Sequence, residues 1–183
     1  MPHVVLTYDN ARRGAGYAGS MSAAFNPEPQ DPPGLAFVFA IRVYFSGRLK
    51  IGTLPSGFVR GFTGAAGGEI AGPKLNGIVV PNTGGDWPAY WPNGAVEFTA
   101  QYMLQADDGT MIVLRNRGYR YAPPEVTARM ERLDPVDPSE YYMRLAPSFE
   151  APAGPHDWLN RSVFIGTANR QADHSVFRFW QVL

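Results

Sequence analysis

The chain has 183 residues, no cysteine, and 16 basic against 16 acidic side chains. This length suffices for one domain with a sizeable core, and the balanced charge, without a long run of one sign, argues against binding to nucleic acid or an anionic membrane. The lack of cysteine excludes disulfides, thiol catalysis and cysteine-ligated zinc, and the many glycine, proline and aromatic residues are typical of a β-rich protein.

Residues 1–34 are predicted to form an N-terminal arm. His3 to Tyr8 has the pattern of an edge strand, Asn10 to Gly19 is polar and glycine-rich, and four prolines lie between Asn26 and Gly34. Because an unpaired edge strand invites partners, we expect this arm to pack across a neighbouring subunit of a homo-oligomer.

The main domain, residues 35–183, is predicted to begin with a strand over 35–45, which is rich in β-branched and aromatic residues. Gly47 to Gly57 is predicted as a turn region around a short strand, and 58–62 continues the sheet. The segment GGEIAGPKLNGIVVPNTGGDW joins two short strands through Gly-Pro and Asn-Gly turns, and its last glycine pair brings Asp86 and Trp87 to a strand end.

The clearest hairpin runs from Val96 to Ala106, turns at Asp107 to Gly109, and returns from Met111 to Arg120. Alternation places two sets of residues on opposite faces of the first strand: Val96, Phe98, Ala100, Tyr102 and Leu104 on one, and Glu97, Thr99, Gln101 and Met103 on the other. The more polar face would meet water in an open sheet and could line a cavity in a barrel. The alternation is compatible with both arrangements.

One helix is predicted at Pro123 to Leu133, which starts with proline and places Glu125 four residues before Arg129. Three strands are predicted to complete the domain, at 140–150, 158–167 and 175–182. Antiparallel strands joined by short turns, with one inserted helix, favour an all-β, closed antiparallel barrel.

Several classes of site lack their sequence signals. The three histidines are scattered, so no metal site is predicted, although oxygen-only ligation stays open. No phosphate loop, dinucleotide fingerprint or nucleophile elbow is present, so we expect no cofactor. The longest apolar run is too short to cross a bilayer and the N-terminus lacks signal-peptide order. We therefore expect a cytoplasmic protein with no membrane or nucleic-acid partner.

Four segments in order resemble the DUF3237 family, also called UPF0311-like proteins: GGEIAGPKLNGIVVPNTGGDW, QADDGTMIVLRNRGYR, DPSEYYMRLAPSFEAP and WLNRSVFIGTANR. The resemblance covers most of 35–183 and implies a lipocalin-like β-barrel with one short helix, to which the arm is an addition. It also implies an enzyme that works without a cofactor, because some members act on lignin-derived or other aromatic compounds in ring-opening, decarboxylation or similar lyase steps.

The chain departs from the family pattern after Glu97. The family tends to have Leu-Asp-Ala-Arg-Tyr there, whereas this chain has Phe-Thr-Ala-Gln-Tyr. An acid and a base have become neutral on one strand face, so no catalytic role of those two family positions carries over to Thr99 and Gln101.

Four residues are candidates for catalysis: Asp86, Glu97, Tyr142 and Arg144. A carboxyl beside an apolar ring or on an interior face can keep its proton near neutral pH, and arginine can hold a substrate carboxylate in a bidentate pair. Each also has a structural interpretation: a turn acid, a solvent-facing acid, or an arginine bonded to barrel carboxylates.

Seven further residues are candidates for substrate binding: Trp87, Tyr102, Arg115, Arg117, Glu150, Trp158 and Asn160. Indole walls and neutral amides suit a planar aromatic ligand, whereas core packing and an exposed basic ladder are the competing interpretations.

Two functions stay open. One is a cofactor-independent lyase or isomerase, of elimination, ring-opening or decarboxylation type, acting on an aromatic or polyketide-like small molecule inside the barrel. The other is a non-catalytic carrier of a similar ligand. A cavity-facing carboxyl with a raised pKa would favour the enzyme, and a cavity of apolar groups and neutral donors would favour the carrier.

Overall fold

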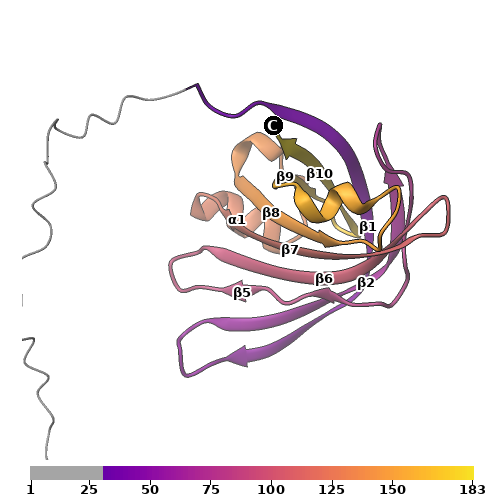
Figure 1. The fold of residues 1–183 in the computed structure, drawn as a ribbon. Coiled ribbons are helices and arrows are strands. Elements are labelled where there is room, and N and C mark those ends of the chain that lie inside the picture. Colours follow the sequence, from indigo (N-terminus) through magenta and orange to yellow (C-terminus); the bar gives the residue numbers. More distant parts are fainter. Residues whose placement is uncertain (1–30) are drawn as a thin grey trace, which may run out of the picture. The chain divides into compact units, whose positions relative to one another are not determined.

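The computed structural model describes residues 31–183, which form one antiparallel ten-stranded sheet closed into a barrel (Figure 1). The predicted strand at His3 to Tyr8, and with it the proposed subunit contact, lies outside the described residues. No helix among those described is long and apolar enough to span a membrane.

The elements follow one another in short steps along the chain. The strands are β1 (Leu35–Thr53), β2 (Val59–Ala71), β3 (Gly77–Val79), β4 (Gly85–Asp86), β5 (Ala89–Tyr90), β6 (Val96–Ala106), β7 (Met111–Tyr121), β8 (Tyr142–Glu150), β9 (Phe164–Arg170) and β10 (His174–Val182). The helices are α1 (Pro124–Glu131) and two short 3₁₀ helices, η1 (Pro138–Glu140) and η2 (Asp157–Arg161).

The barrel closes through β1, which pairs with β10 along its first half and with β2 along most of its length. The predicted turn region at Gly47 to Gly57 is mostly part of this strand. Its glycines mark irregularities in the β1–β2 register, and Gly52 has a φ of 113°, so they bend the strand instead of ending it. The chain turns only between Leu54 and Phe58, whose backbones are hydrogen-bonded at 2.9 Å.

The other predicted elements agree with the structure in most places. β6 and β7 form the expected hairpin with Val96 opposite Arg120, and α1 lies within the predicted helix. The prediction of a strand over 158–167 is wrong in its first half. η2 occupies that stretch because the Asn160 side chain bonds both the N–H and the C=O of Ala151, at 2.9 and 2.8 Å, and holds the chain in a turn.

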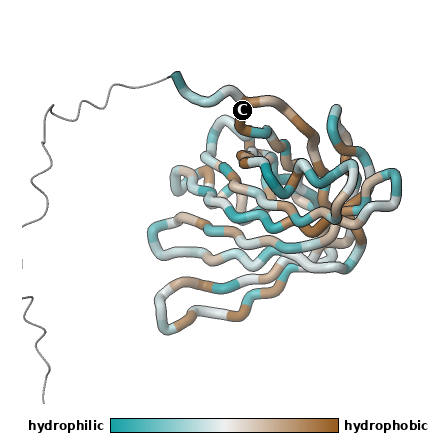
Figure 2. Tube along the Cα trace, viewed as in Figure 1, coloured by the Kyte–Doolittle hydropathy of each residue, from teal (hydrophilic) through white to brown (hydrophobic). Residues whose placement is uncertain are grey.

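Buried and exposed residues alternate along the strands and separate an apolar interior from a polar exterior. Figure 2 shows the accompanying change of hydropathy along each strand. One end of the barrel is filled by aromatic rings that meet edge to face, with centroids 5.0 to 5.9 Å apart: Phe39, Phe149, Phe164 and Phe179. Away from this packed end, toward the start of β6 and the end of β7, the barrel encloses a cavity.

Candidate functional site

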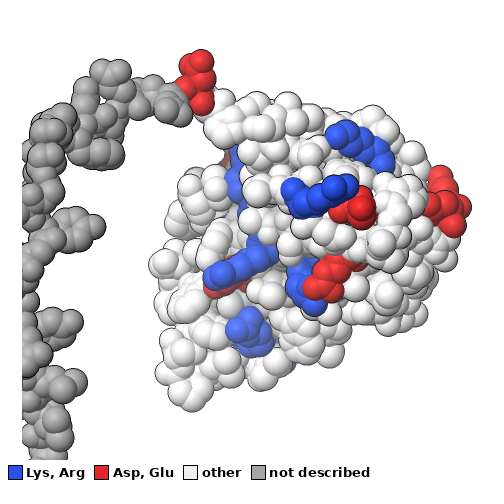
Figure 3. Space-filling view, in the orientation of Figure 1, with Lys and Arg blue, Asp and Glu red and all other residues white. Residues whose placement is uncertain are grey.

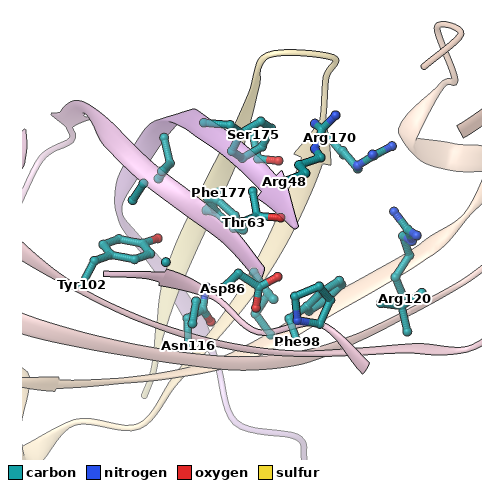
Figure 4. Close-up of a pocket in the computed structure, with 18 of the residues that line it drawn as sticks. Arg48, Thr63, Asp86, Phe98, Tyr102, Asn116, Arg120, Arg170, Ser175 and Phe177 are labelled. Atoms are coloured by element: carbon teal, nitrogen blue, oxygen red, sulfur yellow. The ribbon is translucent and has the colours of Figure 1, made fainter. Parts of the chain in front are cut away.

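The open end of the barrel contains a cavity with about 780 Å³ of empty space, including solvent at its mouth (Figure 4). Its walls are largely apolar and include Phe45, Phe98, Met143, Leu145 and Phe177. Its polar lining is a small set of side chains: Arg48, Thr63, Asp86, Tyr102, Asn116, Arg120, Arg170 and Ser175.

Strand register explains why Asp86 faces this cavity. Asp86 on β4 lies opposite Thr63 on β2 and opposite Ala100 on β6. Ala100 in turn lies opposite Asn116 on β7. Directly opposed residues in antiparallel strands share a face, so the inward face of β6 fixes the inward direction of Asp86 and Asn116.

The Asp86 carboxyl is largely buried and held in place. Its Oδ1 accepts a hydrogen bond from the backbone N–H of Thr99 at 3.0 Å. Burial raises the pKa of Asp86 to about 6, against the opposing effect of the Thr99 and Trp87 backbone N–H groups and of the nearby positive charges of Arg120 and Arg60. A carboxyl of this kind exchanges its proton close to neutral pH, which suits a general acid or base.

Three arginines give the mouth of the cavity a positive charge: Arg48, Arg120 and Arg170. Burial lowers the pKa of Arg120, and burial together with repulsion from Arg120 and Arg48 lowers the pKa of Arg170 to about 10. Arg170 donates to the carbonyl of Met130 at the end of α1 (3.0 Å), and Arg48 donates to that of Ala172 (2.8 Å).

The described part of the chain provides no ion-pair partner for these arginines. Within residues 31–183, none of the three forms an ion pair with a carboxylate. Arg120 and Arg170 are partly desolvated, whereas Arg48 is exposed. Guanidinium groups that converge on one space without an ion-pair partner attract an anion, and each can bind a carboxylate or phosphate through two parallel hydrogen bonds. The same residues contain no cluster of three or more metal-ligating side chains.

Of the four predicted catalytic residues, the structure brings only Asp86 to the cavity. Glu97 lies on the outer face of β6, where Arg117 binds it at 2.7 Å. Tyr142 and Arg144 lie on the outer face of β8, between buried neighbours that point inward. Tyr142 stacks on Tyr121, and Arg144 lies over the ring of Tyr142. These three residues lie outside because the apolar face of each strand is buried in the barrel, and the polar residues that alternate with it therefore face outward.

Among the predicted binding residues, Tyr102 lines the cavity. Trp87 is 47% exposed and packs on Phe62 outside the barrel. Four charged residues form outer-face ion pairs, Arg115 with Glu150 and Arg117 with Glu97. Figure 3 shows acidic and basic side chains lying next to each other on the face in view.

Trp158 and Asn160 do not share a strand face as expected, because η2 replaces the strand. Trp158 packs against Phe164 with ring centroids 5.7 Å apart, and Asn160 holds the backbone of Ala151. Neither residue lines the cavity.

Four cavity residues are not among the predicted site residues: Arg48, Asn116, Arg120 and Arg170. Two of them, Asn116 and Arg120, could be found from the sequence. They lie on the same face of β7 as the buried residues Ile112 and Leu114, and polar residues on an otherwise apolar face indicate a site inside the barrel. Arg48 has no comparable signal, because its direction depends on the β1 irregularities.

The fold and cavity define a small antiparallel β-barrel with a positively charged mouth. The family model described as "Protein of unknown function (DUF3237)" matches residues 33–182, and the chain belongs to this family. A UPF0311 protein from Rhodopseudomonas palustris is 35% identical over 147 residues, covering 80% of this chain and 95% of that protein. The crystal structure of a conserved protein of unknown function from that organism has a TM-score of 0.80 at 32% identity, covering 84% of this chain and 100% of its own.

Two more distant structures have the same architecture. A beta-barrel like protein from Acinetobacter baumannii has a TM-score of 0.71 at 26% identity, covering 85% of this chain and all of its own. A protein described as an enzyme from Penicillium herquei has a TM-score of 0.63 at 20% identity, covering 85% of this chain and 98% of its own. At that identity the likeness shows a common fold alone.

Proposed function

We propose that the barrel is a cofactor-independent lyase or isomerase that binds an aromatic or polyketide-like anion in its cavity and uses Asp86 for proton transfer. One observation carries this proposal: a largely buried carboxyl, with its pKa raised to about 6, faces an apolar-walled space that also contains three arginines without an ion pair to any carboxylate of residues 31–183. The aromatic and aliphatic walls suit a planar ring, and the arginines suit its negative charge.

The chemistry requires only proton movement. As a carboxylate, Asp86 removes a proton from a substrate carbon. In an isomerisation, the protonated Asp86 returns this proton to a different atom. In an elimination, the C–H electron pair forms a double bond and the leaving group departs with its own electron pair. Arg120, whose charge acts directly on Asp86, binds the substrate anion and favours the deprotonated form of the base.

A non-catalytic carrier would use the same cavity, but the carboxyl argues for the enzyme. An anion carrier gains affinity from arginines and loses affinity from a carboxylate placed within reach of the same ligand. Burying this carboxyl also costs folding free energy, as its raised pKa indicates.

The first experiment is native mass spectrometry after incubation with aromatic acids and phenols, followed by chromatography of the released ligand. A lyase step changes the mass of the ligand, whereas an isomerisation changes only its retention time. Conversion supports the enzyme, and binding of unchanged ligand throughout the panel supports the carrier. With a substrate in hand, Asp86→Asn should lower turnover by about 10²–10⁴-fold, the usual effect of removing a positioned acid or base. The rate of a step that uses Asp86 as base should rise as pH increases through about 6.

Matched variants distinguish the effect of a substitution in the cavity from that of the same kind of substitution on the outer face of the barrel. Glu97→Gln removes a carboxyl from the outside of β6, and we expect its turnover to match the wild type. Arg120→Met should weaken substrate binding, whereas Arg144→Met, on the outside of β8, should leave binding unchanged. Wild-type turnover by a folded Asp86→Asn variant would contradict the proposed role of Asp86.

A further inference from the structure

Two buried polar groups in the cavity take no part in the proton-transfer scheme. They are the side chains of Tyr102 and Asn116, two residues that are only 4% and 3% exposed. The hydroxyl oxygen of Tyr102 and Oδ1 of Asn116 are both buried without a hydrogen-bond partner among the described residues. Buried polar atoms in folded proteins are nearly always hydrogen-bonded, since leaving one unpaired costs free energy. Two such atoms in one cavity therefore indicate a place for a polar ligand group.

The sheet register puts these groups away from the arginines. Asn116 lies in the same row of paired residues as Ala100 and Asp86. Tyr102 is two residues further along β6, toward the packed end of the barrel. Arg120 is four residues from Asn116 along β7 in the opposite direction, or about 13 Å between backbone positions at the usual strand rise.

Figure 4 shows the same order, with the three arginines on one side of the view, Tyr102 on the other, and Asp86 and Asn116 between them. The cavity therefore has a cationic end and a neutral hydrogen-bonding end. The Asp86 carboxyl lies between these two ends.

We propose that Tyr102 and Asn116 form a subsite for a carbonyl or phenolic oxygen at the end of the ligand opposite its anionic group. This inference rests on the proposed function and narrows the substrate to an aromatic acid that carries an oxo or hydroxyl substituent on its far side. An unsubstituted aromatic acid would leave both buried polar groups unpaired.

The two side chains supply complementary hydrogen bonds. Burial, and to a smaller extent the charge of Asp86, raises the pKa of Tyr102 well above its usual range, so its hydroxyl stays protonated and donates. The Asn116 amide offers both a donor and an acceptor, and so serves a carbonyl or a hydroxyl. When Asp86 removes a proton from a carbon conjugated with a substrate carbonyl, negative charge develops on that oxygen. The Tyr102 O–H then stabilises it in a largely water-excluded site.

The alternative is that Tyr102 is an ordinary core residue whose ring alone matters. Titration calorimetry can separate the two with a pair of probes, 2-naphthoate and 6-hydroxy-2-naphthoate, which differ only in the hydroxyl opposite the carboxylate. We expect the wild type to bind the hydroxylated probe about 3- to 10-fold more tightly, the range for one net hydrogen bond. Tyr102→Phe should reduce this preference and leave the affinity for 2-naphthoate unchanged.

Tyr121→Phe is the matched control, because Tyr121 is exposed on the outside of the barrel and should retain the full preference. Asn116→Leu, which keeps the side-chain size, should reduce the preference independently of Tyr102. The melting temperature gives a further readout. Tyr102→Phe should not lower it, since the hydroxyl gives up no hydrogen bond within the described chain.

Each outcome decides the matter. Equal binding of both probes by the wild type, or an undiminished preference in Tyr102→Phe, would overturn the subsite and leave the proposed anion site intact. A melting temperature several degrees lower in Tyr102→Phe would overturn it as well, by showing that the hydroxyl has a structural partner. Failure of the wild type to bind either naphthoate would count against the anion site itself and, with it, this inference.

Discussion

The buried carboxyl of Asp86 should make the stability of the protein depend on pH in a way that one substitution removes. Burial raises the pKa of Asp86 from 3.8 to about 6, so the folded state binds this proton more tightly than the unfolded state. The contribution of Asp86 to stability is therefore greatest below pH 4 and is lost as pH rises toward and through 6. The full loss is about 3 kcal/mol, of which roughly 1.4 kcal/mol falls between pH 5 and pH 8.

Asp86→Asn keeps the side-chain shape and an oxygen that accepts from the Thr99 N–H, but it cannot ionise. Relative to the wild type, the variant should therefore become more stable by roughly 1.4 kcal/mol as pH is raised from 5 to 8. Urea unfolding at constant ionic strength measures this difference at each pH. Asp107→Asn is the control, because it removes the same charge from the exposed β6–β7 turn. Comparing the two variants separates the effect of burial from that of the change in net charge. If the stability difference between Asp86→Asn and the wild type is the same at pH 5 and pH 8, the conclusion that burial raises the pKa of Asp86 is wrong.

Three further substitutions test the fold that positions the site. Leu104→Ala should lower the free energy of unfolding by about 2–5 kcal/mol in urea titrations, because Leu104 is fully buried, and a loss below 1 kcal/mol would contradict this packing. Asn160→Ala should cost about 1–3 kcal/mol in the same assay, since it leaves the Ala151 N–H and C=O without their side-chain partner; an unchanged midpoint would count against the η2 turn. Gly118→Val should lower the melting temperature strongly, because its Cβ would overlap the Arg144 carbonyl and the Leu145 side chain on β8, and a wild-type value would show that β7 and β8 are further apart.

Much of the barrel is predictable because its elements depend on local patterns. The β6–β7 hairpin follows from strict alternation on both sides of an Asp-Asp-Gly turn, and α1 follows from its proline start and charge spacing. Irregular segments are less predictable, because side-chain contacts set them. The Asn160 contact with Ala151 replaces the expected strand start with η2, and no sequence period records such a contact.

The candidate site is harder to predict than the elements that build it. Alternation separates the two faces of β6 but does not by itself decide between an interior and a solvent-facing Glu97, and the structure has Glu97 paired with Arg117 on the outside. The direction of the Asp86 side chain depends on the pairing of Asp86 with Ala100. Ala100 lies on β6, which follows a further turn in the chain, so the local sequence around Asp86 does not determine this pairing. Arg48 faces the cavity only because irregularities shift the β1 register, which depends on the pairing with β2.

The double pairing of β1 has a consequence for how the barrel assembles. Every other major contact joins strands that are near one another in the sequence, whereas β1 and β10 pair Leu35 with Val182, with nearly the whole described chain between them. Bringing such distant segments together costs more loop-closure entropy than any hairpin, so this seam is expected to form late in folding. Until it forms, β1 and β10 each present an unpaired edge, and the aromatic rings of Phe39 and Phe179, which meet across the seam, stay in contact with water. A nascent chain that is delayed at this step exposes the unpaired edges of β1 and β10 and the rings that they carry, and such surfaces favour aggregation. The pairing of β1 with β10 therefore affects how much of the chain aggregates before folding is complete.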